Sequence, residues 1–300
     1  MEKAARHNVQ NIYLSEESSN NFVKNIRYDN AALKKVAHLT YEYFMRHKNN
    51  FINILDIGIG SGAFTVPILE YLECQNNINY HLECFDISDK MLLHLEEALS
   101  YKPFIKKKVH LDKMDANEGL RNYYNKWTYD LIIITFVLHY IKNWKSLTKD
   151  VFCCLKKGGL FLQAEIIGDL RNVDGKFDVN SPKLFEKFWK EYFKKRRIYS
   201  SWEPYISVTD LSLVMKYCLR QLKFKILKEK YFYWKTTIMW KDLIDWIKCA
   251  PVSSLGSNLS ELERFQLSTE MNNWLIQNKI KEENFINIRW GFKIIWMVKL

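Results

Sequence analysis

The chain has 300 residues and a mass of 36.0 kDa, which is enough for one large domain or for one domain with a sizeable insertion. Its hydrophobic content of 48% is ordinary for a folded protein. No apolar run approaches the ~20 residues that span a membrane, and the polar N-terminus lacks an apolar signal core. We therefore expect a folded cytoplasmic protein without a membrane partner.

The net charge of +11 and the pI of about 9.2 raise nucleic acid as a partner. The basic residues are spread along the chain, however, and form tight groups only at residues 106–108 and 194–197. A solvated basic surface is the preferred interpretation, and nucleic acid stays open. The six cysteines include no C-x-x-C pair, which favours reduced core thiols and no bound metal.

Strand and helix patterns alternate through the first half of the chain. Apolar residues at helical spacing predict a helix over residues 31–48. The predicted strands are residues 52–58, 79–88, 107–116, 129–141 and 160–168, and the predicted helices between them are residues 61–73, 89–100 and 143–159. Residues 129–141 form a continuous apolar run, which is typical of a strand covered on both faces. The alternation predicts a doubly wound parallel sheet.

The second half of the chain changes character. Residues 181–197 predict an aromatic-rich helix, and a capping-box pattern at residues 207–210 predicts the start of another helix that ends near residue 222. The strand-like alternating segments are residues 224–236 and 287–300, with two predicted helices between them in residues 239–280. Two such strands would complete a seven-stranded sheet, and the helices between them would cover one end of it.

The first predicted strand runs into the segment "DIGIGSG", residues 56–62, with a glycine at every second position. Glycines bring the backbone close to a ligand, and the helix that follows points N–H groups and its positive dipole end at that ligand. The G-x-G-x-G spacing differs from the G-x-G-x-x-G of dinucleotide sites, and no G-K-[ST] follows to form a P-loop. Asp86 ends the second strand, where a carboxylate can accept both hydroxyls of a ribose.

Four segments resemble successive motifs of the class I S-adenosylmethionine-dependent methyltransferases. They are "ILDIGIGSGAF", "CFDISDKML", "KMDANE" and "YDLIIITFVLHYIKN" with "LKKGGLFLQAE", and the resemblance covers residues 50–168. It implies S-adenosyl-L-methionine as the cofactor and S-adenosyl-L-homocysteine as its product. The residues that would border its methionine part are Asp56, Gly58, Gly60, Ser61 and Gly62. Asp86 would hold the ribose, Ile87 and Met91 would flank the adenine, Asp115 and Ala116 would meet its amino edge, and Thr135 and Phe136 would lie near the transferred methyl group.

The layout outside these motifs is similar to small-molecule methyltransferases such as the histamine N-methyltransferase, trans-aconitate methyltransferase and juvenile hormone acid methyltransferase families. We therefore expect an α/β fold, a Rossmann-like doubly wound seven-stranded sheet with an antiparallel last strand and a helical cap insertion. One domain would span residues 1–300. Its expected parts are an N-terminal helical segment (1–50), a cofactor-binding half (51–168) and substrate cap insertions (169–206 and 236–285). Phe136 stands where the histamine enzyme has a polar amide, which argues against histamine itself.

Methyl transfer needs a general base only if the acceptor is protonated at neutral pH. His139, at the predicted carboxyl edge of the sheet, is the candidate base, although it could instead pack against the cap or the loop; Tyr140 has the same two interpretations. Asp29 and Glu165 are polar candidates to orient an acceptor. The aromatic residues that could line an apolar or cation-accepting pocket, or simply pack the cap on the sheet, are Trp189, Trp202, Tyr205, Trp234 and Trp240.

The sequence predicts methyl transfer by in-line displacement to a small-molecule acceptor, whose methylated atom could be nitrogen, oxygen or carbon. Two alternatives stay open. A methyltransferase acting on RNA or on a protein would need an open basic face in place of an enclosed aromatic cap. A non-catalytic cofactor-binding protein would keep the glycine loop but form no acceptor site. The oligomeric state is left open.

Overall fold

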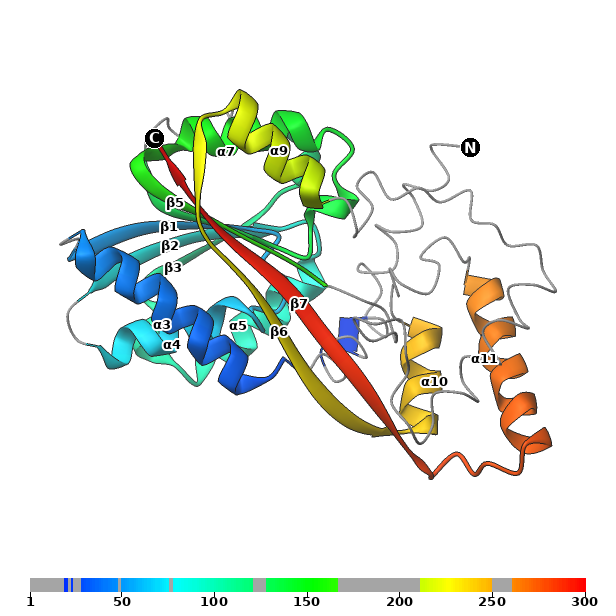
Figure 1. Cartoon of the computed structure of the whole chain (residues 1–300). Coiled ribbons are helices and arrows are strands. Elements are labelled where there is room, and N and C mark those ends of the chain that lie inside the picture. Colours follow the sequence, from blue (N-terminus) through cyan, green and yellow to red (C-terminus); the bar gives the residue numbers. More distant parts are fainter. Residues whose placement is uncertain are drawn as a thin grey trace. The chain divides into compact units, whose positions relative to one another are not determined.

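The computed structural model describes residues 19–20, 23, 28–47, 50–75, 78–120, 128–166, 211–249 and 261–300 (Figure 1). Contacts divide the chain into two compact units. The larger unit comprises Tyr28–Ile166, Pro204–Phe232 and Phe292–Leu300, and the smaller unit comprises Met1–Arg27, Ile167–Glu203 and Tyr233–Gly291. The predicted helix over residues 181–197 and the predicted capping box lie outside the described residues.

Seven strands form one sheet in the order β3-β2-β1-β4-β5-β7-β6. Their bounds are β1 Phe51–Ile57, β2 Asn79–Asp86, β3 Val109–Lys113, β4 Tyr129–Thr135, β5 Leu155–Ile166, β6 Phe224–Met239 and β7 Phe285–Lys299. The pairs within β1 to β5 are parallel, and β5 pairs with β7 antiparallel from Leu160 opposite Val298 to Ile166 opposite Phe292. The predicted Rossmann-like seven-stranded sheet with an antiparallel last strand is confirmed.

The helices of the described residues begin either with or without a side-chain cap. They are α3 Asn30–Arg46, α4 Thr65–Cys74, α5 Asp89–Ser100, α6 Pro103–Lys106, α7 Trp144–Cys154, α9 Leu211–Gln221, α10 Trp240–Cys249 and α11 Glu261–Gln277, with short 3₁₀ turns η1 Ala116–Glu118 and η2 Leu138–Tyr140. The Asp29 carboxylate accepts from Ala32 N at 3.0 Å, and Ser88 Oγ accepts from Met91 N at 3.2 Å. Both residues therefore act as N-caps, as expected for Ser88.

Helices cover both faces of the sheet in the larger unit, with α3, α4 and α5 on one face and α7 and α9 on the other (Figure 1). Leu55 and Ile57 of β1 belong to the core cluster that contains Val151 of α7 and Val214 of α9. Because alternate residues of a strand point to opposite faces, the intervening Asp56 points toward the α3–α4 side. The alternation of β1 therefore decides where this acid lies.

The two largest differences from the predicted strand boundaries are at the end of β4 and the start of β5. β4 ends at Thr135, because Phe136 takes a φ of 60°, which an extended strand does not allow. The apolar run continues past the strand because Leu138 and Ile141 are buried in the same core. β5 begins early, at Leu155, and its pairing with β4 shifts register between Tyr129 and Leu131.

The smaller unit contains α10 and α11, which pack against each other. The rings of Trp240 and Trp274 lie 6.4 Å apart between centroids, and both side chains are buried. The two predicted helices of residues 239–280 are thus confirmed. No helix in the described ranges is long and apolar enough to cross a membrane.

Candidate functional site

The glycine loop leaves β1 in a conformation that glycine adopts readily. Gly58, Gly60 and Gly62 have φ values of 73°, 58° and 74°, in the left-handed region. The backbone amides of Gly58 and Ile59 both donate to the carbonyl oxygen of Phe85, at 2.9 and 3.1 Å. The loop is therefore held against the end of β2, with its backbone exposed to whatever approaches the carboxyl edge of these two strands.

The three glycines differ in which neighbouring atoms a side chain at that position would meet. A Cβ at Gly58 would come within 2.4 Å of Val137 Cγ2, and one at Gly62 would come within 2.5 Å of Leu95 Cδ1. A Cβ at Gly60 would meet only the flexible end of Met91, at 3.3 Å. Gly58 and Gly62 therefore let the surrounding side chains close over the loop. Gly60 is the position whose missing side chain leaves room beside Met91.

Asp86 connects the end of β2 to the loop. Its Oδ2 accepts from Gly60 N at 2.9 Å, and its Oδ1 accepts from Ser88 N at 2.9 Å. Burial raises the pKa of this carboxyl, and the backbone hydrogen bonds partly oppose that rise. A carboxylate has about four acceptor positions, so Asp86 keeps capacity to accept from a ligand hydroxyl. This spare capacity is compatible with a bound ribose, and the ribose role of Asp86 stays a prediction.

The expected adenine residues lie beside this carboxylate. Ile87 is partly buried between β2 and α5, and Met91 is buried in α5 against Gly60. Asp115 is the N-cap of η1, and its Oδ1 accepts from the backbone and side-chain nitrogens of Asn117, both at 2.9 Å. Ala116 is buried in the core. The sequence did not anticipate that Asp115 also holds this turn.

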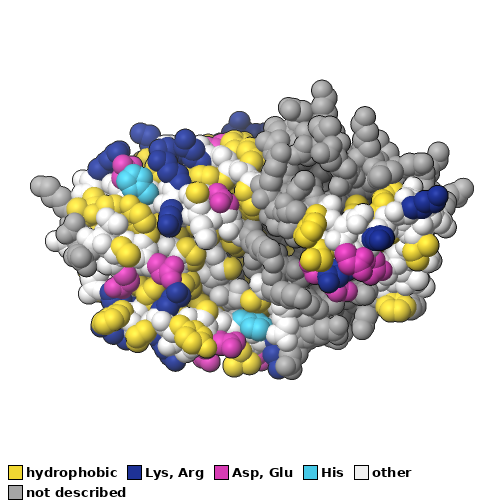
Figure 2. Space-filling view, turned by 90° about the horizontal axis from the view of Figure 1, so that it is seen from below, with side chains coloured by type: hydrophobic (Ala, Val, Ile, Leu, Met, Phe, Trp, Pro, Cys, Tyr) yellow, Lys and Arg dark blue, Asp and Glu magenta, His cyan; other side chains and the backbone are white. Residues whose placement is uncertain are grey.

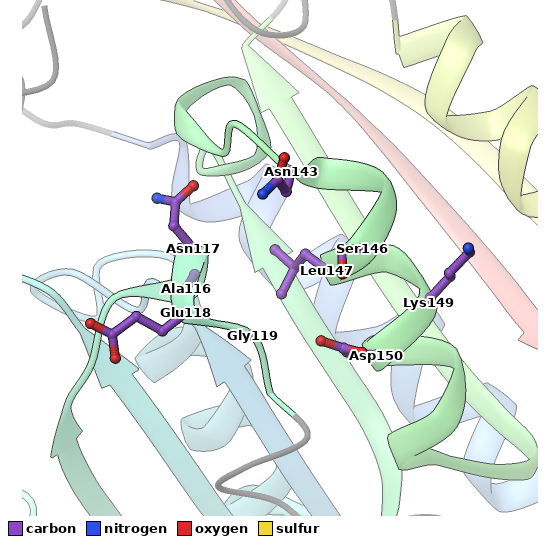
Figure 3. A pocket seen from close by; sticks show the side chains of 9 residues that line it. All are labelled: Ala116, Asn117, Glu118, Gly119, Asn143, Ser146, Leu147, Lys149 and Asp150. Atoms are coloured by element: carbon purple, nitrogen blue, oxygen red, sulfur yellow. The ribbon is translucent and has the colours of Figure 1, made fainter. Parts of the chain in front are cut away.

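A polar pocket opens between η1 and the start of α7 (Figure 3). It has a volume of about 420 Å³, and its lining side chains include Asn117, Asn143, Ser146 and Asp150. Asp150 accepts from Leu120 N at 3.1 Å, which closes the inner wall. The other polar side chains shown in Figure 3 are largely exposed, so this pocket is a surface hollow beside η1.

Asp56 is fully buried below the loop. The Thr65 hydroxyl at the start of α4 donates to its Oδ2, whereas its Oδ1 accepts no hydrogen bond from the described residues. Burial raises the pKa of this carboxyl to about 7, the Thr65 bond opposes the rise, and the negative charge of Asp86 adds to it. Asp56 therefore supports the loop from beneath, and Ser61, also buried, begins the turn above it.

The ends of β4 and β5 carry an aromatic cluster. Thr135 ends β4 as a buried residue, and Phe136 N donates to Ala164 O at 2.9 Å. The Phe136 ring stacks on Tyr28, with centroids 5.3 Å apart and planes 16° apart, and meets Phe64 and Phe292 edge-on. These contacts hold Phe136 in its left-handed backbone conformation, which would otherwise be costly.

Tyr28 belongs to this aromatic cluster, although no pattern in the sequence singled it out. Burial, and the neighbouring Glu165 and Tyr140, raise the pKa of its hydroxyl well above its usual range. Tyr28 thus lies near two predicted acceptor-site residues, Glu165 and Tyr140, and also stacks on Phe136. The only sequence signal was its position, directly before the helix-capping Asp29.

The remaining predicted residues lie outside the described side chains or in the smaller unit, and their roles stay predictions. The backbone of His139 lies in η2, just beyond β4, but its side chain is outside the described set. Trp189, Trp202 and Tyr205 also lie outside the described residues. Trp234 is partly buried in β6 and Trp240 is buried at the start of α10, both in the smaller unit. Among the described side chains, no group of His, Cys, Asp or Glu could hold a metal ion.

Comparison with known proteins gives a consistent family signal. Residues 55–161 match the family model described as "Methyltransferase domain". The chain is 26% identical over 198 residues to malonyl-[acyl-carrier protein] O-methyltransferase 2 of Ilyobacter polytropus, covering 63% of each chain. It is 28% identical over 128 residues to demethylmenaquinone methyltransferase of Leptospira interrogans, covering 42% of this chain and 48% of that protein. The chain thus spans less than two thirds of either relative.

The fold has relatives among solved structures. A structure from Anaeromyxobacter dehalogenans, assigned as a type II methyltransferase, superposes on this chain with a TM-score of 0.55 at 11% sequence identity. The superposition covers 90% of this chain and 96% of that one. At this identity the likeness concerns the fold alone, and it agrees with the strand order described above.

Proposed function

Because residues 55–161 are a methyltransferase domain with the class I S-adenosylmethionine-dependent fold, we propose that this protein transfers a methyl group to a small-molecule acceptor. The observation that carries the proposal is the Asp86 carboxylate, bonded to Gly60 of the glycine loop and still able to accept a hydroxyl. S-adenosylmethionine is the cofactor of this class. When bound, it supplies a methyl group on a positively charged sulfur.

Different residues of the larger unit would contact different parts of the cofactor. Asp86 would accept the ribose hydroxyls, and the backbone of Gly58, Gly60 and Ser61 would lie along the methionine part. Ile87 and Met91 offer apolar surface to the adenine. Holding an acceptor in line with the methyl group supplies much of the acceleration through orientation, so these residues act mainly by fixing position.

The acceptor site would lie at the ends of β4 and β5. The Tyr28–Phe136 stack would offer apolar ring faces to an acceptor there, and such ring faces favour a positive charge nearby. Glu165 and Tyr140, which lie near Tyr28, are the proposed polar groups that orient the acceptor. His139 is the proposed base for an acceptor that must lose a proton. Asp29, next to Tyr28 in the chain, is a further proposed polar group, and the substrate roles of Trp189, Trp202, Tyr205, Trp234 and Trp240 stay predictions.

The relatives favour a small or carrier-borne acceptor. The names of these two relatives specify a quinone precursor in one case and a malonyl group on a carrier protein in the other. A small-molecule acceptor is the simpler inference, since nothing described requires a macromolecule at the carboxyl edge. The atom methylated follows from the acceptor and is left to the experiment.

Calorimetric titration with S-adenosylhomocysteine tests the cofactor site. The wild type should bind it, Gly60→Val should fail because its side chain fills the space beside Met91, and Asp86→Ala should fail because the ribose loses its acceptor. Gly158→Val is the matched control, because Gly158 also has a positive φ, of 74°, but has no atom within 4 Å of its Cβ position. Absence of binding by the wild type would contradict the proposal.

Transfer itself is then tested with methyl-labelled cofactor and a panel of amines, carboxylic acids and phenols. Label in a small product that depends on the enzyme supports the proposed acceptor class. Label recovered only in added RNA or protein would show that the acceptor is a macromolecule. Cofactor binding without any transfer would favour a non-catalytic protein.

A further inference from the structure

A protruding basic and aromatic turn lies at the end of the sheet opposite the glycine loop. α6 connects α5 to β3 at the amino end of the parallel strands, whereas Gly60 and Asp86 lie at their carboxyl end. The turn contains the sequence "YKPFIKK", residues 101–107. We call its outward side chains the α6 patch: Tyr101, Lys102, Phe104, Lys106 and Lys107.

The α6 patch exposes two aromatic rings on a fixed backbone. Tyr101 is 81% exposed and Phe104 is 69% exposed, although each is large enough to favour burial. Between them, Pro103 begins the helical turn and Ile105 is buried with only 4% exposure, which anchors it. Because the turn is anchored from within, it presents both rings continuously to the outside.

The same turn carries positive charge that Glu70 and Glu73 do not neutralise. Glu70 pairs with Lys102, and Glu73 pairs with Lys108 at 2.6 Å, so both acids are already engaged. Lys106 and Lys107 are exposed and form no ion pair with the described part of the chain. Lys107 Nζ instead lies 5.1 Å from the centroid of the Phe104 ring. The patch therefore combines aromatic surface with an excess of cations.

We propose that the α6 patch docks the protein on an anionic lipid surface. Aromatic rings settle at the level of the lipid headgroups, and lysines beside them are attracted by acidic headgroups. The net charge of +11 adds a long-range attraction to such a surface. Over the described part of the face seen in Figure 2, hydrophobic and basic side chains lie among acidic ones. Lipid complements both the charge and the apolar rings.

RNA fits the position of the patch less well. A strand of RNA serving as a methyl acceptor would have to reach the carboxyl edge, where the glycine loop lies, and the α6 patch is at the other end of the strands. The proposal departs from the expectation of no membrane partner, which rested on the lack of a spanning segment. Surface docking needs no such segment. It is also independent of the proposed methyl transfer and leaves the glycine loop free.

Co-sedimentation with lipid vesicles tests the docking. Wild-type protein is mixed with vesicles of phosphatidylcholine alone or of phosphatidylcholine with phosphatidylserine. It should sediment with the anionic vesicles and stay in solution with the neutral ones. Lys106→Gln with Lys107→Gln should weaken anionic-vesicle binding about 25-fold, since each lysine contributes about fivefold. Tyr101→Ser with Phe104→Ser should weaken it without changing its salt dependence.

Matched control variants remove two lysines or two aromatic rings from exposed positions outside the α6 patch. Lys241→Gln with Lys281→Gln deletes the same charge from exposed positions of the smaller unit, and Phe265→Ser with Phe285→Ser deletes two exposed rings. Both controls should bind anionic vesicles like the wild type. Equal losses in the controls and the patch variants would overturn the proposal, because binding would then be non-specific. Failure of the wild type to sediment, or patch-dependent binding to single-stranded RNA alone, would overturn it too.

Discussion

Gly60 and Asp86 form one structural unit, because the Gly60 amide donates to the Asp86 carboxylate across 2.9 Å. The same carboxylate accepts from Ser88, so the glycine loop, the end of β2 and the start of α5 are fixed together by one side chain. A ligand that uses Asp86 therefore meets a loop whose position is already set. Positioning of this kind lowers the entropy that binding would otherwise lose.

Asp86→Asn should weaken binding of S-adenosylhomocysteine at least tenfold. The amide has one acceptor atom in place of two, so one of the two backbone amides loses its partner, and hydrogen bonds to charged groups are worth about 1.5–3 kcal/mol. Calorimetry measures the affinity and thermal unfolding measures the stability. Asp89→Asn is the control, because Asp89 is exposed and, within the described residues, pairs with exposed Lys113 alone. A variant that binds as the wild type does would remove Asp86 from the cofactor site.

Gly58→Ala should destabilise the fold by about 2–4 kcal/mol, which combines overpacking with an unfavourable positive φ. The new methyl group would lie 2.4 Å from Val137 Cγ2. Gly158→Ala has a similar φ but open space around the Cβ, so it should lose only about 1 kcal/mol. Denaturant unfolding measures both. Adding Val137→Ala to Gly58→Ala should recover the overpacking part; no recovery would mean that Val137 is not the obstacle.

Much of the fold could be predicted because its signals are local. The continuous apolar run of β4, the Ser88 cap and the glycines after β1 each carry a structural meaning within a few residues of sequence. The end of β4 could not be predicted in the same way. Its apolar pattern continues through Leu138 and Ile141, and only the backbone at Phe136 shows that the strand has stopped.

The site was predicted less completely because some of its residues act through distant contacts. Tyr28 matters through its stack on Phe136, a residue far along the chain, and no local pattern marks that pairing. Gly58 looked like a ligand-approach position, yet its closest constraint is Val137. The cofactor roles of Asp115 and Asp56 stay predictions. The structure adds that one holds η1 and the other lies under the loop.

Asp56 should make the protein less stable as the pH rises from about 4 to 7. Its pKa is about 7 in the folded chain and 3.8 as the ordinary value, so the folded state binds the proton more strongly. The stabilisation is therefore complete below pH 3.8 and is lost as the pH rises through about 7. Its upper limit is about 4 kcal/mol, because one pKa unit corresponds to about 1.4 kcal/mol.

Asp56→Asn should abolish this slope while keeping an acceptor for the Thr65 hydroxyl. The free energy of unfolding is measured for both proteins from acid to neutral pH. The two curves should cross or converge, because the variant becomes more stable relative to the wild type as the pH increases. Asp130→Asn serves as a control, since Asp130 pairs with Lys156 and Asn53 at the opposite end of the strands. Parallel curves for Asp56→Asn and the wild type would show that Asp56 is ionised throughout.

Tyr28→Phe should leave stability within about 1 kcal/mol of the wild type, because the ring that stacks on Phe136 is retained. Tyr28→Leu should lose about 2–3 kcal/mol, since it removes the stack and leaves Phe64 and Phe292 without their edge contacts to that ring. Denaturant unfolding separates the two. If Tyr28→Phe is as damaging as Tyr28→Leu, the hydroxyl near Glu165 and Tyr140 stabilises this end of the sheet, and the aromatic stack does not. If the expected order holds, Tyr28→Phe is a folded variant in which the hydroxyl can be tested for acceptor binding alone.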